Sequence, residues 1–362
     1  MYRDDFLQKK LNERKEGHAF RELRMPGGKT DFCSNDYLGI VHDRLLKDPV
    51  TEMLSGSTGS RLLAGNYALI EQTEQQLARF HEAEDALIFN SGYDANLGLL
   101  SSVPQKGDTI LYDQLSHASI RDGIRLSFAQ SFAFAHNDMA DLQKKLAHAT
   151  GTVFIVTESV FSMDGDTCPL QELVAMSRQY NAHLIIDEAH ATGVVGGKGE
   201  GLVQHLGLQQ SIFARVHTFG KACGCHGAVI LGSRDLRDYL INFARSLVYS
   251  TSLPEHSVAM IQNSYQVFPG MLAARDRLQD LIRQFQSASL RFEKLVSDTP
   301  IQVVIIPGNE EVRKVADALQ QQNLDVRAIL YPTVPKGKER LRVVLHAFNT
   351  PEELDRLIAA LR

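Results

Sequence analysis

A buried apolar segment, His183–Ile186, runs directly into Asp187-Glu188-Ala189-His190. Its composition is typical of a strand inside a parallel sheet, and ligands bind just beyond the carboxyl ends of such strands. A carboxylate there needs a positive or hydrogen-bonding partner, because an unpaired buried charge is very costly. Asp187 is therefore a candidate to hold a cationic ligand group, of which a protonated pyridine nitrogen is one example.

A lysine follows another predicted strand, in the segment Val216-His217-Thr218-Phe219-Gly220-Lys221. Most lysines lie in exposed loops, but Lys221 comes 34 residues after Asp187, which leaves room for one helix or loop and one return strand. This spacing places both residues at the same sheet edge. A lysine and an aspartate there can hold the two ends of one flat cofactor, as pyridoxal 5′-phosphate is held.

Groups suited to a phosphate and to the face of a ring are expected at the same edge. Ser91-Gly92-Tyr93 is a glycine turn that opens a helix, where backbone N–H groups favour an anion. Thr218 and the hydroxyl-rich stretch Tyr249-Ser250-Thr251-Ser252 are further candidates for the phosphate. His117 also follows a strand and opens a helix; alone it would be an ordinary histidine, but beside these signals it is a candidate to stack on a cofactor.

Two other interpretations of these motifs fail on spacing. Asp-Glu-Ala-His also occurs in helicase-type ATPases, but these need a phosphate loop, and Leu23 stands where a loop ending in Gly28-Lys29-Thr30 requires glycine. Cys223-Gly224-Cys225-His226 lacks the two-residue gap of zinc knuckles and has no second cysteine pair downstream. We therefore expect no metal site.

The elements that must position these residues alternate along the chain. Apolar strands without alternation are predicted at 86–89, 109–112, 131–134, 152–157, 183–186, 212–217 and 228–231, separated by helices or loops. Such a pattern indicates an α/β fold with a parallel sheet covered on both faces. After a long predicted helix from Pro254 to about Asp298, strands and helices up to residue 361 indicate a compact α+β unit. We expect an arm at 1–40, a large cofactor-binding domain at 41–270 and a small domain at 271–362.

Composition restricts the possible partners. The chain has 362 residues, of which 44% are hydrophobic, and a formal net charge of -5, so nothing indicates a nucleic-acid surface or a polybasic membrane anchor. No apolar run approaches the ~20 residues of a membrane helix, and the charged first 20 residues contain no signal sequence. Four cysteines are too few for a disulfide framework and are expected to be free thiols in a reducing cytoplasm. The expected partners are small molecules.

Several motifs in a fixed order resemble the α-oxoamine synthases, a family of pyridoxal 5′-phosphate (PLP) enzymes. The matching segments are Ser34–Gly39, Gly56–Arg61, Asn90–Tyr93, Glu158–Gly165, Asp187–His190, Thr218–Lys221, Pro332–Pro335 and Arg340–Arg342. The resemblance extends from about residue 5 to residue 361. It implies a fold of the aspartate-aminotransferase type (fold type I), with a mostly parallel central sheet covered by helices and a smaller C-terminal α+β domain.

The resemblance also implies roles for individual residues. The expected catalytic residues are Lys221, which carries PLP as a Schiff base and moves protons, Asp187, which keeps the pyridine nitrogen protonated, His117, which stacks on the ring, and His190. Other expected cofactor contacts are Ser162 near the 3-hydroxyl group, and Ser91, Gly92, Tyr93 and Thr218 near the phosphate. The expected substrate contacts are Glu158 and Asn35 beside the substrate, Arg342 at the amino-acid carboxylate and Arg21 at the acyl-chain entrance.

The implied reaction is the decarboxylative condensation of an amino acid with an acyl thioester, in a homodimer. The motifs favour the branch that joins L-alanine to a pimeloyl group in biotin biosynthesis; glycine-using branches are the alternative, and the acyl carrier is either coenzyme A or a carrier protein. A binding protein that kept the fold but lost the chemistry is disfavoured by intact Lys221, Asp187 and His117. One departure stands out, because Leu330-Tyr331 occupies the place where relatives can carry an arginine before Pro332-Thr333-Val334-Pro335. Arg327 or Lys336 could replace that charge, or the acyl chain could differ.

Overall fold

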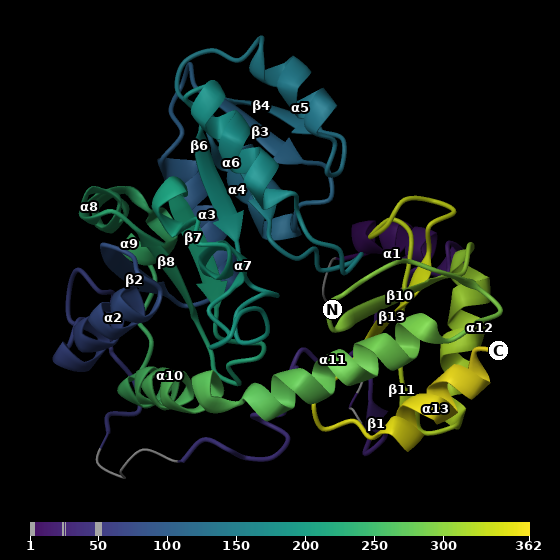
Figure 1. The fold of residues 1–362 in the computed structure, drawn as a ribbon. Coiled ribbons are helices and arrows are strands. Elements are labelled where there is room, and N and C mark those ends of the chain that lie inside the picture. The colour runs from purple at the N-terminus through teal and green to yellow at the C-terminus, as the bar shows by residue number, and fades with distance from the viewer. Residues whose placement is uncertain (1–3, 24, 26, 48–52) are drawn as a thin grey trace. The chain divides into compact units, whose positions relative to one another are not determined.

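The computed structural model describes residues 4–23, 25, 27–47 and 53–362. They form two compact units, shown in Figure 1. The larger unit comprises Asp36–Ser162 and Thr167–Arg275, and the smaller unit comprises Met1–Asn35, Met163–Asp166 and Asp276–Arg362.

A seven-stranded sheet forms the centre of the larger unit. Its strands lie in the order β2 (Asp85–Phe89), β8 (Ala228–Gly232), β7 (Ala214–Thr218), β6 (His183–Asp187), β5 (Val153–Glu158), β3 (Thr109–Asp113) and β4 (Gln130–Phe134). Strands β7, β6, β5, β3 and β4 are parallel, whereas β8 runs antiparallel to both of its neighbours. Strand β2 therefore runs in the same direction as β7. The sheet is mostly parallel, as predicted, and the carboxyl ends of six strands lie at one edge.

Helices cover both faces of this sheet. They are α2 (Ala68–Phe80), α3 (Gly92–Ser102), α4 (Ala118–Leu126), α5 (Met139–Leu146), α6 (Leu170–Gln179), α7 (Leu202–His205), α8 (Arg234–Phe243), α9 (Arg245–Val248) and α10 (Glu255–Val267). One apolar core joins α3, α4 and α8 to the sheet, and a second joins α5, α6 and α7 to it. Every residue of β5 and β7 is buried, because both faces of these strands pack against helices. This explains why their sequences show no alternation of apolar and polar residues.

The smaller unit contains a four-stranded antiparallel sheet in the order β12 (Arg327–Ile329), β13 (Arg340–Val344), β10 (Ile301–Ile305) and β9 (Glu293–Lys294). A two-residue parallel pair, β1 (Thr30–Asp31) with β11 (Leu324–Asp325), attaches the N-terminal segment. The remaining helices are α1 (Phe6–Glu16), α11 (Leu272–Ser287), α12 (Asn309–Gln321) and α13 (Pro351–Ala360). Helix α13 begins with a capping box, in which Thr350 and Glu353 satisfy each other's backbone N–H groups.

The structure corrects the single long helix predicted from Pro254 to Asp298. Helix α10 ends at Val267, a 3-10 turn follows at Phe268–Gly270, and α11 ends at Ser287. Pro269 lacks an N–H group and clashes with the preceding turn, so it interrupts the helix. Arg275 then donates to the carbonyls of Phe268 at 2.8 Å and Pro269 at 2.9 Å, which satisfies the groups that the interruption leaves free. The predicted N-terminal helix over 1–24 is also shorter, since α1 covers only Phe6–Glu16; residues 1–3 and 24 lie outside the described residues.

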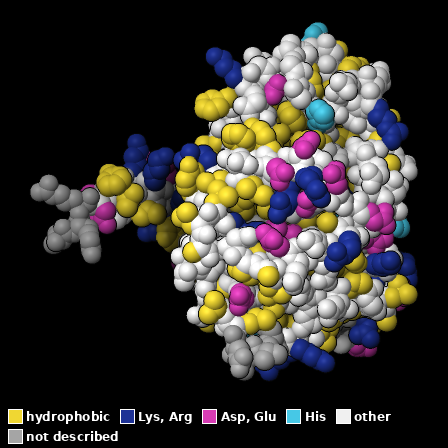
Figure 2. Space-filling model, turned by 90° about the vertical axis from the view of Figure 1, so that its left-hand side faces the viewer, with side chains coloured by type: hydrophobic (Ala, Val, Ile, Leu, Met, Phe, Trp, Pro, Cys, Tyr) yellow, Lys and Arg dark blue, Asp and Glu magenta, His cyan; other side chains and the backbone are white. Residues whose placement is uncertain are grey.

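The surface carries charges of both signs. On the face that Figure 2 shows, Lys and Arg side chains are interspersed with Asp and Glu, without a field of one sign. On the larger unit, for example, Asp85 lies 3.4 Å from Arg237 and 3.7 Å from Arg234. Within the described part of the chain, no helix is both long and apolar enough to cross a membrane.

Candidate active site

Lys221 lies just beyond β7, at the carboxyl edge of the large sheet. Its Nζ is 3.0 Å from Nε2 of His190, and Nδ1 of His190 is 2.6 Å from the hydroxyl of Tyr37. His190 and Tyr37 are buried, so the contact between them is shielded from water, whereas Lys221 is partly buried. The three side chains form a continuous hydrogen-bonded line that can hold or move a proton at the amine. Lys221 and His190 were predicted from sequence, whereas Tyr37 was given no role although its motif was recognised.

Two buried carboxylates end neighbouring strands at the same edge. Glu158 on β5 and Asp187 on β6 stand opposite each other in register, and they are only 2% and 6% exposed. Burial, together with the charge of Asp187, raises the pKa of Glu158 to about 8, although nearby Lys221 opposes the shift. The backbone N–H of His117 donates to Glu158 at 2.6 Å. At neutral pH Glu158 is therefore largely protonated and can donate a hydrogen bond, whereas the two carboxylates could not both stay ionised cheaply.

His117 begins helix α4 as its N-cap residue. Its Nδ1 accepts from the backbone N–H of Ser119 at 3.2 Å and lies 2.8 Å from the Ser119 hydroxyl. Burial lowers the pKa of His117, as does the charge of Lys221, while Asp187 acts in the opposite direction. The imidazole is thus kept neutral, and a neutral ring is suited to lie against a flat cofactor.

The carboxylate of Asp187 has two hydrogen-bond donors. The backbone N–H of Ala189 donates to Oδ1 at 2.9 Å, and the side-chain amide of Asn96 donates to Oδ2 at 2.7 Å. Asn96 also donates to Ser119 at 3.0 Å. Neither Asn96 nor Ser119 was predicted from sequence. A signal existed, because Asn96 lies four residues after Gly92 and therefore on the same face of α3.

The N-terminus of α3 offers an open position for an anion. Ser91 caps this helix by accepting the Asp94 N–H at 3.0 Å, and its own hydroxyl donates to Asp94 at 2.7 Å. A side chain on Gly92 would begin 3.5 Å from Thr218, so glycine leaves the helix end accessible beside the Thr218 hydroxyl. The first N–H groups of a helix and a hydroxyl are donors that suit a phosphate. Tyr93 is 43% exposed, and its hydroxyl binds Asp122 at 2.5 Å.

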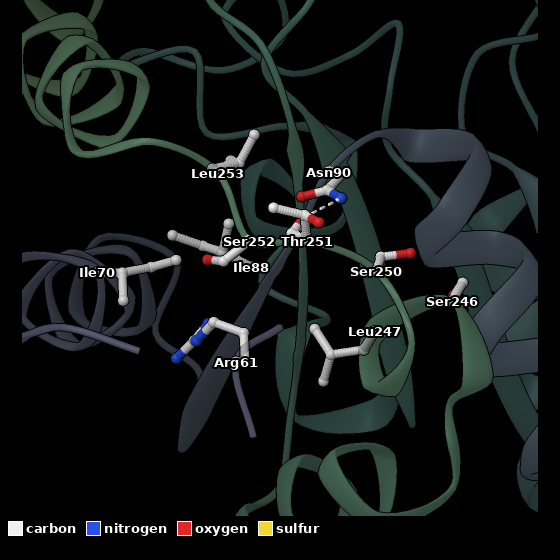
Figure 3. A pocket seen from close by; sticks show the side chains of 10 residues that line it. All are labelled: Arg61, Ile70, Ile88, Asn90, Ser246, Leu247, Ser250, Thr251, Ser252 and Leu253. Atoms are coloured by element: carbon white, nitrogen blue, oxygen red, sulfur yellow. Dashed lines mark hydrogen bonds between the residues drawn. The ribbon is translucent and has the colours of Figure 1, made fainter. Parts of the chain in front are cut away.

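The hydroxyl-rich stretch after Tyr249 is held by other loops of the larger unit. Asn90 donates to the Thr251 carbonyl at 2.8 Å (Figure 3). The Ser252 N–H donates to the carbonyl of Gly59 at 2.9 Å. The cavity that these residues line with Arg61 has a volume of about 10 Å³. This is room for about one water molecule and not for a phosphate. The predicted contact between this stretch and a phosphate stays a prediction.

Glu188 closes the loop that carries His190. This carboxyl is fully buried and accepts the N–H groups of Leu202 at 2.9 Å and Val203 at 2.7 Å. Burial raises its pKa, while these donors act against the shift. Gly201 has a φ of 100°, and a Cβ there would lie 2.6 Å from the Glu188 carboxyl, so only glycine fits. Both ends of the segment 188–203 are thereby fixed, with His190 near its beginning.

The smaller unit contains the other predicted substrate residues. Arg342 on β13 donates to Oδ1 of Asn35 at 2.9 Å, so the structure brings these two together. Arg21 donates to Thr333 at 3.0 Å and is exposed. It borders a cavity of about 550 Å³, to which Arg14, Arg313, Arg327 and Leu330 also contribute. This unit therefore has arginines beside the uncharged Leu330.

These groups fit PLP. In the larger unit, a buried carboxylate is available for the pyridinium, a neutral imidazole for the ring face, and an amine for covalent attachment. An open helix N-terminus beside Thr218 is available for the phosphate. Ser162, the remaining predicted cofactor residue, is buried and donates its backbone N–H to Glu158.

Comparisons with known proteins give the same result. The model of the family "Aminotransferase class I and II" matches residues 27–361. Sequences named 8-amino-7-oxononanoate synthase are similar over most of the chain. One from Emericella nidulans is 41% identical and covers 98% of this chain and 94% of its own, and one from Marinobacter nauticus is 38% identical with the same coverage.

Solved structures agree in fold. Serine palmitoyltransferase from S. paucimobilis, with a bound PLP–myriocin aldimine, superposes with a TM-score of 0.90 at 27% identity, covering 99% of this chain and 96% of that one. The 8-amino-7-oxononanoate synthase from Francisella tularensis gives 0.77 at 29% identity, covering 92% and 97%. These relatives confirm the fold type and the cofactor that the sequence motifs predict. The chain belongs to the aminotransferase class I and II family and, within it, to the PLP-dependent α-oxoamine synthases.

Proposed function

We propose that this enzyme condenses L-alanine with a pimeloyl thioester, with loss of carbon dioxide, to form 8-amino-7-oxononanoate for biotin synthesis. The observation that carries the proposal is the sheet edge, where Lys221, His190, Asp187 and His117 lie together in one unit. The two sequences named for this reaction are 38% and 41% identical to this chain, and the solved structure with that name is 29% identical, whereas the serine palmitoyltransferases are 26–28% identical. The difference favours the oxononanoate synthases over the serine palmitoyltransferases.

Each residue at this edge has a distinct task. PLP, when bound, withdraws electrons from the α-carbon of the amino acid, which makes its proton removable. Asp187 would hold the protonated pyridine nitrogen, and His117 would lie against the ring. Lys221 carries the cofactor and then moves the α-proton, with His190 and Tyr37 behind it as the hydrogen-bonded line that holds a proton at Nζ. Protonated Glu158 donates a hydrogen bond to substrate oxygen.

The smaller unit supplies the groups that bind carboxylates. Arg342 is expected to bind the amino-acid carboxylate as a two-pronged ion pair, with Asn35 fixing the guanidinium from the side. Arg21 is expected to bind the far carboxylate of the pimeloyl chain, because Leu330 offers no charge. The arginines around the 550 Å³ cavity suit an anionic acyl carrier, either coenzyme A or a carrier protein.

We further propose a homodimer in the cytoplasm. Large apolar side chains of the larger unit are exposed, among them Leu63 at 85%, Tyr249 at 73% and Phe243 at 57%. Aromatic side chains are enriched at protein interfaces, so these residues are candidates for contact with a second copy. Free thiols at Cys33, Cys223 and Cys225 suit a reducing compartment. Sedimentation at micromolar concentration tests the dimer, and a stable, active species at the chain mass of 40.3 kDa would refute it.

A substrate panel tests the reaction. Pimeloyl and octanoyl thioesters of coenzyme A and of a carrier protein are each offered with alanine, glycine and serine, and products are identified by mass. We expect the aminoketone from alanine and pimeloyl thioester to dominate. Preference for glycine or serine, or for the uncharged octanoyl chain, would show that a different α-oxoamine synthase reaction is the true one. An absorption band near ~420 nm in the purified protein reports the bound cofactor independently.

A further inference from the structure

We propose that Asn96 is a positioning residue for this reaction, which couples Asp187 on one side of the cofactor site to His117 on another. Its role would be to hold the carboxylate in place and, through Ser119, to fix which nitrogen of His117 carries the proton. This inference rests on the proposed function, since it assigns Asn96 to the same site. It concerns side chains of the larger unit only.

The contacts of Asn96 use both hydrogens of its amide. One is donated to Oδ2 of Asp187 at 2.7 Å and the other to the hydroxyl of Ser119 at 3.0 Å. The carbonyl oxygen of the same amide is buried and has no hydrogen-bond partner in the described structure. An unpaired buried acceptor is unfavourable, so the residue is kept for its donors. Leucine would fill the same space without this cost.

The direction of each hydrogen bond follows from Asn96. Ionised Asp187 can only accept, so the NH₂ group of Asn96 must face it. The Ser119 oxygen then accepts from Asn96, and its own proton is available to His117 Nδ1, which lies 2.8 Å away. The backbone N–H of Ser119 points to the same nitrogen at 3.2 Å. Nδ1 is therefore an acceptor, and the proton of the neutral imidazole is on Nε2.

The backbone around Asn96 is held closely. Helices α3 and α4 pack at Gly123, where an added Cβ would lie only 2.8 Å from the backbone carbonyl oxygen of Asn96. Asn96 is 2% exposed, and neighbouring Ser119 is 1% exposed. Neither side chain can therefore exchange its partner for water. Asparagine also avoids a third carboxyl beside Asp187 and Glu158.

The first experiment is a double-mutant cycle read by PLP affinity. Apo-protein is titrated with PLP, and the pH at which the cofactor's absorption band changes is recorded for each variant. Asn96→Leu should weaken PLP binding by about 10- to 100-fold, as expected for the loss of a hydrogen bond to a charged group. Ser119→Ala removes the hydroxyl that links Asn96 to His117 but keeps the hydrogen bond from Asn96 to Asp187, so it should have a smaller effect. The double variant should bind PLP no more weakly than Asn96→Leu, because both substitutions interrupt the same series of hydrogen bonds.

Thr73→Val is the matched control. Thr73 is a fully buried helical side chain whose hydroxyl bonds the Leu69 carbonyl, away from the site. This variant should lose stability without moving PLP affinity or the pH of the band. If Asn96→Leu behaves like the control, or if the two site variants have fully additive effects on PLP affinity, the proposed coupling of Asp187 to His117 through Asn96 is wrong.

Asn96→Asp gives a second test that holds even if the leucine variant does not fold. When the introduced carboxyl is protonated it can donate to Asp187, whereas when it is ionised it repels Asp187. The ratio of the PLP dissociation constants at pH 8 and pH 6 should therefore rise about tenfold over that of wild type. An unchanged ratio would contradict the role. Wild-type protein that never binds PLP would instead overturn the proposed function, so the two failures are distinguishable.

Discussion

The two units hold the side chains for the proposed reaction in different environments. At the sheet edge of the larger unit, Glu158, Asp187 and His190 are buried, and each is held by hydrogen bonds to neighbouring elements. Around the cavity of the smaller unit, Arg21 is exposed and its guanidinium donates to Thr333. A buried charge is costly to leave unpaired, whereas an exposed one is screened by water. We therefore expect substitutions at the sheet edge to reduce turnover strongly, by an amount that depends on the group removed. Substitutions at the cavity should have small effects, and only with a particular substrate.

Lys221→Ala gives the largest expected effect. Removing the amine removes both the covalent attachment of the cofactor and the group that moves the α-proton, so turnover should fall below a few per cent of wild type. The fold should persist, because the Lys221 side chain is only partly buried and packs no core. Product formation and circular dichroism check the two halves of this prediction. Lys198→Ala, in an exposed part of the same unit, should keep full activity.

Asp187→Asn should reduce turnover by about 10²- to 10³-fold or more, as expected for breaking a buried charge pair worth about 3–5 kcal/mol. PLP should still bind, because Lys221 is unchanged. The chemical step should fail, because the amide cannot hold the pyridinium proton by charge. Asp113→Asn is the control, since Asp113 is a buried carboxylate at the end of β3 that binds His136 at 3.0 Å. The control should lose stability rather than catalysis. Equal kinetic losses in the two variants would remove the distinction between the two strand ends.

A pH effect on stability comes next in size. His81 and His217 are fully buried with their rings 4.1 Å apart, and burial holds the pKa of each well below its usual value. In the unfolded chain the two imidazoles bind protons near pH 6.5, whereas in the folded chain they stay neutral. The free energy of unfolding therefore decreases as pH falls below that value. From pH 7.5 to pH 5.5, wild type should lose about 1.4 kcal/mol more than His217→Gln. Urea unfolding at both pH values measures this, and parallel curves would contradict it.

Arg21→Ala should have the smallest effect, and only on one substrate. Because Arg21 is exposed, its contact with a carboxylate is expected to contribute about 1 kcal/mol or less, or roughly fivefold in KM. The KM for pimeloyl thioester should rise, while that for octanoyl thioester stays constant. Equal changes for both thioesters would show that Arg21 does not bind the carboxylate. A rise of about 100-fold would instead show that the cavity is as shielded as the sheet edge.

Much of the larger unit could be predicted from sequence, because its strands are continuous apolar runs and its reactive residues follow their ends directly. Asp187, Lys221 and His117 were found this way. The antiparallel strand β8 was recognised as a strand, but its direction depends on the sheet it joins. Pro269 was visible in the sequence, yet the apolar pattern on both sides predicted one uninterrupted helix.

The missed residues share a physical cause. None of them directly follows the end of a predicted strand, and each acts through a partner side chain; they are Asn96, Ser119 and Tyr37. Asn96 meets Asp187 across 91 positions and Tyr37 meets His190 across 153. The spacing of Asn96 from Gly92 indicates the helix face that it shares, but residue type and spacing do not indicate its partner, since an asparagine inside a helix is usually solvated. Only the packing of α3 against the sheet reveals which side of the helix is buried.

The closure of the segment 188–203 by Glu188 has a consequence for how the chain can change over time. The two ends are joined by the bonds to Leu202 and Val203, while Gly197 and Lys198 lie at the surface between them. The entropy cost of a closed loop grows slowly, by about 0.6 kcal/mol for each doubling of its length. Insertions at residues 197–198 should therefore be tolerated without disturbing His190. The enzyme can vary the length of a surface loop that follows shortly after His190 in the sequence while the chemistry stays in place.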